Sequence, residues 1–360
     1  MNRLHHLKQT LPQNLLDNED YPQLEFILLD YNSKDGMEAW VKQEMASFIA
    51  SGRLTYFRTE APAFFNRSHS RNLAFNLCSG ALLCNVDADN FTGKGFAAYL
   101  NAEFCSDPGI LVNSHFLHEY LPYKDAFGRF GAWRNDFHEA GGYDEAMASY
   151  GYEDIDFYER LVLLGRKEVK IDNFSFLRSI AHDDAERISQ EFFHNNLEKL
   201  YLAYGNGFTK TLFLFKDKTF ETGTLTAQDE YYEGLFTIQG GAWQKGAWEI
   251  TPEELRLRFR NGKEMVLGTT NQGLVYLLKD ESTRLSFFHI SNEVVIEEVK
   301  QKYSLVTNVS RMKKNMEAQK ARVNPEGYGR GMVYRNFTRE KTEVKEPLKG
   351  VSVPDMNRNL

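Results

Sequence analysis

Two short apolar segments that each run into an aspartate constrain the fold of this chain more than any other feature. One is Leu24–Leu29 (LEFILL), followed by Asp30, and the other is Ala81–Val86 (ALLCNV), followed by Asp87. Apolar runs of this length between polar turns are typical of strands buried in a parallel sheet. The sequence therefore predicts two such strands, each with a carboxylate directly after it.

Two helices are predicted between these strands. They span Gly36–Ser51 and Ser68–Cys78, and the second follows polar capping residues and ends just before a glycine. Alternating strands and helices predict an α/β fold with an open sheet, and such sheets bind ligands at the carboxyl ends of their strands. We therefore expect Asp30, Asp87 and Asp89 to lie at a ligand site.

The composition is that of a folded protein and excludes some classes of partner. Of the 360 residues, 42% are hydrophobic, and the formal net charge of −7 does not favour binding to nucleic acid. No segment approaches the roughly 20 consecutive apolar residues that cross a bilayer. Cys78, Cys84 and Cys105 are too few, and odd in number, for a disulfide framework. We expect a cytoplasmic protein without an integral membrane segment.

The pattern changes in the second half of the chain. From about Thr209 to about Ser304, short alternating runs such as TLFLF and LRLRFR are separated by glycines and by an Asn-Gly pair. Period-two alternation with such turns predicts a small antiparallel β module. Within it, Trp243 and Trp248 are expected to fill the core, with a carbohydrate platform as the alternative.

These changes of pattern predict four parts of the chain. Residues 1–205 form the α/β catalytic domain and residues 206–305 the inserted β module. Residues 306–340 contain a basic helix, Met312–Val323, and a loop that return to the first domain, and residues 341–360 form a charged tail.

Asp87-Ala88-Asp89 places two carboxylates on a tight turn after an apolar strand. A hard divalent cation beside a diphosphate needs this arrangement, although an isolated Asp-x-Asp is more often a solvated turn. His182 follows a second candidate strand, Phe174–Ile180, and offers an imidazole to the same metal, the alternative being a structural histidine.

An acidic segment, Gly151-Tyr152-Glu153-Asp154-Ile155-Asp156, precedes an apolar helical pattern. Its acids fall in a first helical turn, where they complement the helix dipole or, as the functional alternative, supply a general base for an acceptor hydroxyl. The nearby Tyr150 and Tyr152 present aromatic faces that suit sugar rings or the protein core.

In this order the motifs resemble inverting glycosyltransferases of family 2, and especially the β-1,4-galactosyltransferase and N-acetylgalactosaminyltransferase group. The resemblance covers about residues 1–200. Its most specific part is GAWRNDFHEAGGYDEAMASYGYEDIDFYERL, in which an aromatic residue, here Tyr150, precedes the acidic pair with the catalytic base. NVDADN is similar to the metal-binding Asp-x-Asp, and RSIAHDD to the segment that supplies a metal-ligand histidine.

The resemblance implies a role for each candidate residue. Met1-Asn2-Arg3, LLDYNSKDG and Phe65-Asn66-Arg67 resemble the segments that bind the nucleotide of the donor. The implied donor-binding residues are Arg3, Asp30, Phe65, Arg67, Arg71 and Asp87. The implied acceptor-binding residues are Tyr150, Tyr152 and Asp156, and the implied metal ligands are Asp87, Asp89 and His182.

The resemblance also implies a Rossmann-like glycosyltransferase A fold that carries the inserted β module. The activity it implies is that of a hexosyltransferase, which moves a hexose or N-acetylhexosamine from a UDP-sugar to a glycan or other hydroxyl acceptor with inversion. Asp154 is the expected general base, assisted by Glu153, and Mn²⁺ or Mg²⁺ binds the donor diphosphate. The alternative is a catalytically inactive carbohydrate- or nucleotide-binding protein of the same fold.

Overall fold

The structure, a computed structural model, describes residues 1–114, 126–147, 149–181, 184–205, 208–227, 236–238, 243–269, 275–278 and 286–345. The chain forms two compact units. The first contains Met1–Ala148, Tyr152–Gln190 and Met312–Leu360, and the second contains Ser149–Gly151 and Glu191–Arg311. Within the described residues, no helix has the length and apolar character needed to span a membrane.

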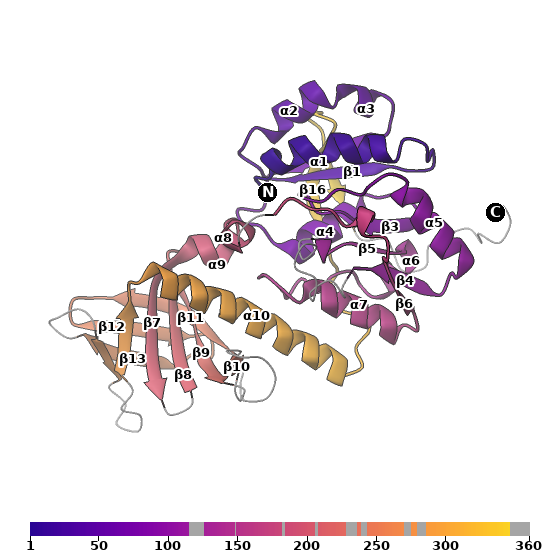
Figure 1. The fold of residues 1–360 in the computed structure, drawn as a ribbon. Coiled ribbons are helices and arrows are strands. Elements are labelled where there is room, and N and C mark those ends of the chain that lie inside the picture. The colour runs from indigo at the N-terminus through magenta and orange to yellow at the C-terminus, as the bar shows by residue number, and fades with distance from the viewer. Residues whose placement is uncertain are drawn as a thin grey trace. The chain divides into compact units, whose positions relative to one another are not determined.

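The first unit contains a four-stranded sheet of order β1-β2-β16-β17, of which Figure 1 labels β1 and β16. β1 (Phe26–Tyr31) is parallel to β2 (Leu54–Thr59), and β16 (Gly331–Arg335) is antiparallel to both β2 and β17 (Lys341–Val344). The first residues of the predicted charged tail therefore form an edge strand, and the rest of that tail lies outside the described residues.

Alternate side chains of β1 are buried on opposite faces of this sheet. Phe26 and Leu28 pack with the helices α1 (Leu4–Asp17) and α2 (Met37–Glu44), whereas Ile27 and Leu29 pack in the cluster that includes Leu73 of α4 (Arg67–Asn76). Successive side chains of a strand point to opposite faces, so a strand covered on both sides needs a continuous apolar run. For this reason the continuous apolar run LEFILL predicted a buried strand.

A second four-stranded sheet has the order β3-β5-β4-β6. β3 and β4 both pair antiparallel with β5, whereas β4 and β6 are parallel. The helix α5 packs on one face of this sheet, and α4, α6 and α7 pack on the other. The bounds of these elements are α4 Arg67–Asn76, β3 Leu82–Asn85, α5 Phe96–Ser106, β4 Ile110–Asn113, β5 Phe130–Trp133, α6 Arg134–Glu139, α7 Glu153–Leu163 and β6 Lys167–Lys170.

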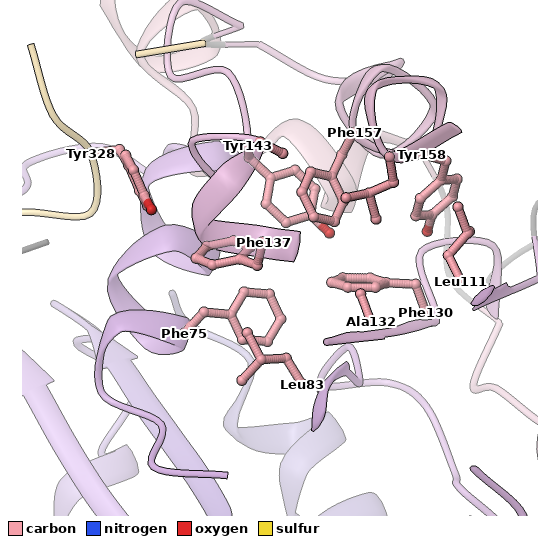
Figure 2. Close-up of a cluster of buried hydrophobic side chains, with 12 residues drawn as sticks. Phe75, Leu83, Leu111, Phe130, Ala132, Phe137, Tyr143, Phe157, Tyr158 and Tyr328 are labelled. Atoms are coloured by element: carbon pink, nitrogen blue, oxygen red, sulfur yellow. The ribbon is translucent and has the colours of Figure 1, made fainter. Parts of the chain in front are cut away.

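An aromatic cluster fixes α7 against this second sheet (Figure 2). Phe157 of α7 stacks on Tyr143 with ring centroids 4.7 Å apart and meets Phe130 of β5 edge to face at 5.2 Å. Burying a large apolar side chain contributes about 1.5–3 kcal/mol. The start of α7, which carries the predicted catalytic acids, is therefore held by a rigid core.

The second unit is built on a ring of antiparallel strands. Pairing runs β9-β11-β12-β13-β14-β15-β7-β8, and β8 pairs again with β9, so eight strands close on themselves and β10 adds to one edge of β9. The strands are β7 Leu197–Gly205, β8 Phe208–Phe215, β9 Thr219–Ala227, β10 Phe236–Ile238, β11 Gln244–Ile250, β12 Glu254–Phe259, β13 Glu264–Thr269, β14 Val275–Leu278 and β15 Ser286–Ile290.

Alternating side chains of β7 and β8 separate two hydrophobic clusters in this unit. Leu212 and Leu214 pack with Trp248 in one cluster, whereas Phe213 and Phe215 pack in the other with Tyr303 of the helix α10 (Glu293–Glu317). The Trp248 indole donates to the Phe215 carbonyl at 3.0 Å and is almost fully buried. Trp248 therefore fills the core, as the sequence favoured, and Trp243 packs in the second cluster.

The first unit also includes the short helices α3 (Ala46–Ala50) and α8 (Asp184–Ile188), and the second begins with α9 (Phe192–Asn196). The predicted helix over residues 36–51 is divided into α2 and α3 because Met45, with φ −103°, leaves the helical conformation. Of the predicted basic helix at 312–323, only residues 312–317 are helical, and they form the end of α10, which starts at Glu293. Ile296, Val299, Tyr303 and Val306 give α10 one apolar face at helical spacing.

Two further predictions about secondary structure were wrong in detail. The two aspartate-ended strands, β1 and β3, lie in separate sheets because β3 pairs with β5, and β1 with β2. The segment predicted as a strand from Phe174 to Ile180 instead begins with a 3₁₀ helix, Phe174–Phe176, because the Asn173 side chain accepts the Ser175 backbone N–H at 3.1 Å. Only Ser179 of this segment makes a β bridge, to Asn90. The fold class itself, α/β with an antiparallel β module, is confirmed.

Candidate active site

The acidic helix start is formed by an unusual backbone turn. Gly151 has φ 95° and Tyr152 has φ 65°, so two successive residues adopt the left-handed conformation just before α7. This conformation is costly for a tyrosine, and such strain is often found at functional sites. The turn places Glu153, Asp154 and Asp156 in the first turn of α7, and all three are buried.

The Asp87 carboxylate lies two residues beyond the end of β3. The Asn85 amide donates to Asp87 Oδ1 at 3.0 Å and to the Gly128 carbonyl at 3.0 Å, which fixes the direction of the aspartate. About 35% of the Asp87 side chain remains exposed, so it keeps access to a ligand.

Arg71 of α4 joins the strand-end aspartate to the acids of α7. Its Nη1 donates to Asp154 Oδ1 at 2.7 Å and to Glu153 Oε1 at 3.1 Å, and its Nη2 donates to Asp87 Oδ1 at 3.4 Å. The guanidinium also lies 5.2 Å from the ring centroid of Tyr143. One buried cation thus brings together three carboxylates that are up to 67 residues apart in the sequence, from Asp87 to Asp154.

Burial and charge set the protonation of this group. Burial raises the pKa of Asp154 to about 8, against the lowering effect of Arg71, and the neighbouring Glu153 and Asp87 raise it further. Burial also favours a higher pKa for Asp87, but the Arg71 guanidinium and the Asn85 amide have the larger effect, and the pKa of Asp87 is lowered. Burial disfavours the charged form of Arg71, but the surrounding carboxylates raise its pKa well above the ordinary value. The two aspartates are therefore tuned in opposite directions.

Asp89 is buried on the same turn as Asp87. The Asn90 side chain donates to Asp89 Oδ1 at 2.9 Å, and the Asp89 carbonyl accepts the Ile180 N–H at 2.8 Å. Residues 178–180 thus run antiparallel to residues 89–91. His182 lies just beyond, outside the described residues, so its role as a metal ligand stays a prediction.

Two predicted donor-binding residues lie at the start of α4. Arg67 stacks over the Phe65 ring at 5.5 Å, and its Nη2 donates to the Arg187 carbonyl at 2.7 Å. Its Nε is 4.0 Å from Glu153 Oε1, which connects this pair to the acids around Arg71.

Other predicted site residues are engaged elsewhere. Asp30 is fully buried and accepts from Tyr56 Oη and Arg58 Nη1, both at 2.7 Å. Arg3 donates to the side chain and the carbonyl oxygen of Glu186. These contacts show how the fold positions Asp30 and Arg3, and their predicted roles towards a nucleotide stay predictions.

Asp156 is likewise held by residues other than Arg71. Asp156 is fully buried, with Arg160 Nε on one oxygen at 2.7 Å and the Asn315 amide on the other at 2.9 Å. Both oxygens thus have protein partners, and the role towards an acceptor predicted for Asp156 stays a prediction. Tyr150 belongs to the second unit, where the Asn308 amide donates to the carbonyls of its neighbours Ser149 and Gly151.

Three residues at this site were not found from the sequence. Asn85 orients Asp87, and Gly128 leaves the space between the carboxylates, since a Cβ there would lie 2.9 Å from Asp87 Oδ2 and 3.1 Å from Asp154 Oδ2. Arg129 is fully buried, with one hydrogen bond to Asn90 Oδ1 at 3.0 Å. An asparagine before an aspartate and a Gly-Arg pair carry no local signal, because only the packing of β5 against β3 brings them together.

The site of this α/β protein thus places the Asp87-Ala88-Asp89 turn next to Asp154, a buried carboxyl group whose pKa is raised. Residues 109–183 match the family described as the N-terminal domain of galactosyltransferase. Residues 109–183 are therefore similar to a galactosyltransferase domain, which confirms the resemblance predicted from the motifs.

Solved structures similar to this chain include two of Drosophila β-1,4-galactosyltransferase 7. One, a mutant in complex with manganese, UDP-Gal and xylobiose, is 16% identical with a TM-score of 0.30 and covers 46% of this chain and 74% of that chain. The other, a catalytic domain in complex with xylobiose, is 16% identical with a TM-score of 0.28 and covers 50% of this chain and 88% of that chain. No curated protein matches the chain.

Proposed function

We propose that this protein is an inverting glycosyltransferase that transfers a hexose or N-acetylhexosamine from a UDP-sugar to a hydroxyl group of a glycan acceptor. The observation that carries the proposal is the Arg71 junction, which connects Asp87 on the aspartate turn with Asp154 at the start of α7. It lies in the same unit as the galactosyltransferase-family segment. A donor-side carboxylate and a candidate base are thus held next to each other.

Asp154 is the proposed general base. Its pKa of about 8 lies close to neutral pH, where a base is most effective because it is both available and strong enough to take a proton. Arg71 holds Asp154 Oδ1, while Asp154 Oδ2 faces the space left by Gly128. Asp154 Oδ2 would take the proton from the attacking acceptor hydroxyl, and no covalent sugar intermediate is needed for inversion.

The aspartate turn fits a hard divalent cation such as Mn²⁺ or Mg²⁺. Asp87 and Asp89 would hold it, with His182 as the third proposed ligand, and their orientation by the Asn85 and Asn90 amides is the outer-shell support that metal-binding carboxylates require. When bound, such a cation stabilises the negative charge of the leaving diphosphate. Arg67, beside Phe65, is the proposed cation for the donor phosphates.

A transfer assay tests the proposal directly. The full chain is incubated with a panel of UDP-sugars and glycan acceptors, with Mn²⁺, with Mg²⁺ and with a chelator, and the glycosylated product is measured. We expect metal-dependent transfer with at least one donor. Donor binding without any transfer would instead support a catalytically inactive binding protein, and absence of both would reject the proposal.

A further inference from the structure

A second group of metal-ligating side chains includes none of the residues of the aspartate turn. His5 and His6, at the start of α1, and Glu186 of α8 each offer one ligand atom, and these three atoms lie within 4.8 Å of one another. Among the described residues, this is the one set of three or more His, Cys, Asp or Glu side chains that meets that condition. Nothing in the proposed transfer reaction uses these residues.

The contacts of α1 position the two histidines of this group. The start of the helix is fixed because Asp35 Oδ2 accepts the Leu4 N–H at 2.8 Å, and Leu7 and Leu11 are buried in the core. One turn after His6, Thr10 donates to the Ala88 carbonyl at 2.6 Å. Residues four apart share one face of a helix, so His6 is buried on the side of α1 that packs on the aspartate turn. The His5 side chain, in contrast, is 59% exposed.

Glu186 is far from the two histidines in the sequence, and several contacts hold its segment beside the start of α1. Asn2 Nδ2 donates to Gln190 Oε1 at 2.6 Å, and the Gln190 carbonyl accepts the Phe65 N–H at 2.8 Å. Arg3 donates to the Glu186 side chain, and His5 Nε2 lies 2.9 Å from Glu186 Oε1. The carboxylate is therefore already oriented towards the start of α1.

We propose that His5, His6 and Glu186 form a binding site for a divalent transition-metal ion such as Zn²⁺, with an open coordination position for water or an anionic ligand. Two imidazoles and one carboxylate suit zinc and its neighbours in the transition series, whereas Mg²⁺ and Ca²⁺ prefer oxygen ligands alone. Three protein ligands leave a fourth tetrahedral position open. The contact between Arg3 and Glu186 then acts as the outer-shell hydrogen bond that orients a ligand carboxylate.

This site differs in chemistry from the proposed donor-metal site, so the two can be measured separately. Zn²⁺ is titrated by calorimetry into chelator-treated full-length protein in the absence of any nucleotide sugar. We expect saturable binding of Zn²⁺ that is lost on adding a chelator, and a Co²⁺-loaded sample with the visible absorption of a site containing nitrogen ligands. Metal ligation by histidine releases a proton, so the apparent affinity should also fall at acidic pH.

Two ligand variants and two matched controls decide the assignment. His5→Ala and Glu186→Gln should each weaken Zn²⁺ binding by at least about tenfold, since even outer-shell partners contribute about 10- to 100-fold. Asp87→Asn, on the aspartate turn, and His289→Gln, which removes an imidazole from β15, should leave the Zn²⁺ affinity unchanged. Because His5 is exposed, its substitution should not affect folding, which circular dichroism would verify for each variant.

The possible outcomes separate the alternatives. Loss of binding in His5→Ala and Glu186→Gln with both controls intact supports the site. Unchanged affinity in both ligand variants, absence of saturable binding by the wild-type chain, or loss of binding in Asp87→Asn alone would each overturn it. None of these results depends on whether the protein transfers a sugar.

Discussion

Arg71 Nη1 donates to Asp154 Oδ1 at 2.7 Å, and this contact joins two parts of the molecule that the sequence analysis assigned to different roles. Arg71 was predicted to bind the donor and Asp154 to activate the acceptor. In the structure, the same guanidinium also reaches Asp87 on the aspartate turn at 3.4 Å. Changes at the aspartate turn can therefore act on Asp154 through the side chain of Arg71.

Asp154→Asn should lower kcat sharply while leaving donor affinity nearly intact. The amide preserves the shape of the side chain but cannot take the proton of the acceptor, and general-base assistance contributes about 10²- to 10⁴-fold. Steady-state kinetics at saturating donor and acceptor would measure kcat, and calorimetry would measure the dissociation constant of the donor. Glu159→Gln, an exposed acid on the same helix, is the matched control and should retain wild-type kcat. If Asp154→Asn also retains it, Glu153 becomes the next candidate for the base.

Asp89→Asn should, in contrast, affect the binding of the donor more than kcat. It removes a negative charge from the turn proposed to hold the divalent cation, so metal-dependent donor binding should weaken. Donor titrations at several Mn²⁺ concentrations would show a lower affinity that higher Mn²⁺ partly restores. A loss of kcat without any change in metal dependence would contradict the proposed role of Asp89.

The sequence predicted the helices and strands of this site better than the way in which they pair and pack. LEFILL and ALLCNV identified β1 and β3 because the side chains of both strands pack in hydrophobic clusters on both faces, which favours a continuous apolar run. The pairing of β3 with β5 depends on contacts about 50 residues apart in the sequence, and no local pattern encodes them. For this reason two sheets were predicted as one.

The same limit applies to individual side chains. The first-turn acids of α7 were recognised as a group without their separate partners, which are Arg160 for Asp156 and Arg71 for Asp154. Residues at i and i+4 share a face of a helix, so the Asp156–Arg160 pair was in principle readable. The Asp154–Arg71 pair was not, because it depends on how α4 and α7 pack.

The pH dependence of kcat/KM should reflect Asp154. Because burial raises its pKa to about 8, the ionised base becomes more abundant as pH rises, and kcat/KM should increase up to about pH 8 before levelling. A rate that is flat between pH 6 and 9 would contradict this assignment.

The stability of the folded protein should show the opposite trend. The folded state holds the Asp154 proton up to about pH 8, whereas the ordinary pKa is 3.8, so the folded state binds more protons between these values. The free energy of unfolding contributed by Asp154 therefore falls as pH rises through this range. In Asp154→Asn this contribution is absent, and denaturant titrations at several pH values should show a smaller loss of stability towards pH 8.

Gly128→Ala should impair activity more than stability. The added Cβ would lie 2.9 Å from Asp87 Oδ2 and 3.1 Å from both Arg71 Nη2 and Asp154 Oδ2, so these side chains must shift. A displacement of about 1 Å can cost about 10²-fold in rate. Gly268→Ala is the control, because nothing lies within 4 Å of a Cβ there. Comparison of kcat/KM and thermal midpoints should show a rate defect in the first variant only.

Two fully buried arginines should respond in opposite ways to replacement by methionine. Arg160 is satisfied by Asp156 at 2.7 Å and by the carbonyls of Ala140 and Gly142, both at 2.8 Å. Arg160→Met would leave the buried Asp156 carboxylate without its cation, which typically costs about 3–5 kcal/mol of unfolding free energy.

Arg129 is equally buried, but its Nε and Nη1 have no hydrogen-bond partner and burial lowers its pKa to about 10. Replacing a buried charge that has unpaired donors by an apolar side chain of similar size removes the desolvation cost of the charge and of those donors. We therefore expect Arg129→Met to unfold at the same or a higher urea concentration than the wild type, and Arg160→Met at a clearly lower one. A large loss of stability in Arg129→Met would show that this guanidinium contributes to folding in spite of its unpaired donors. If Arg129→Met is stable but transfers sugar more slowly, the buried charge next to Asp87 and Asp89 is retained for its effect on the reaction.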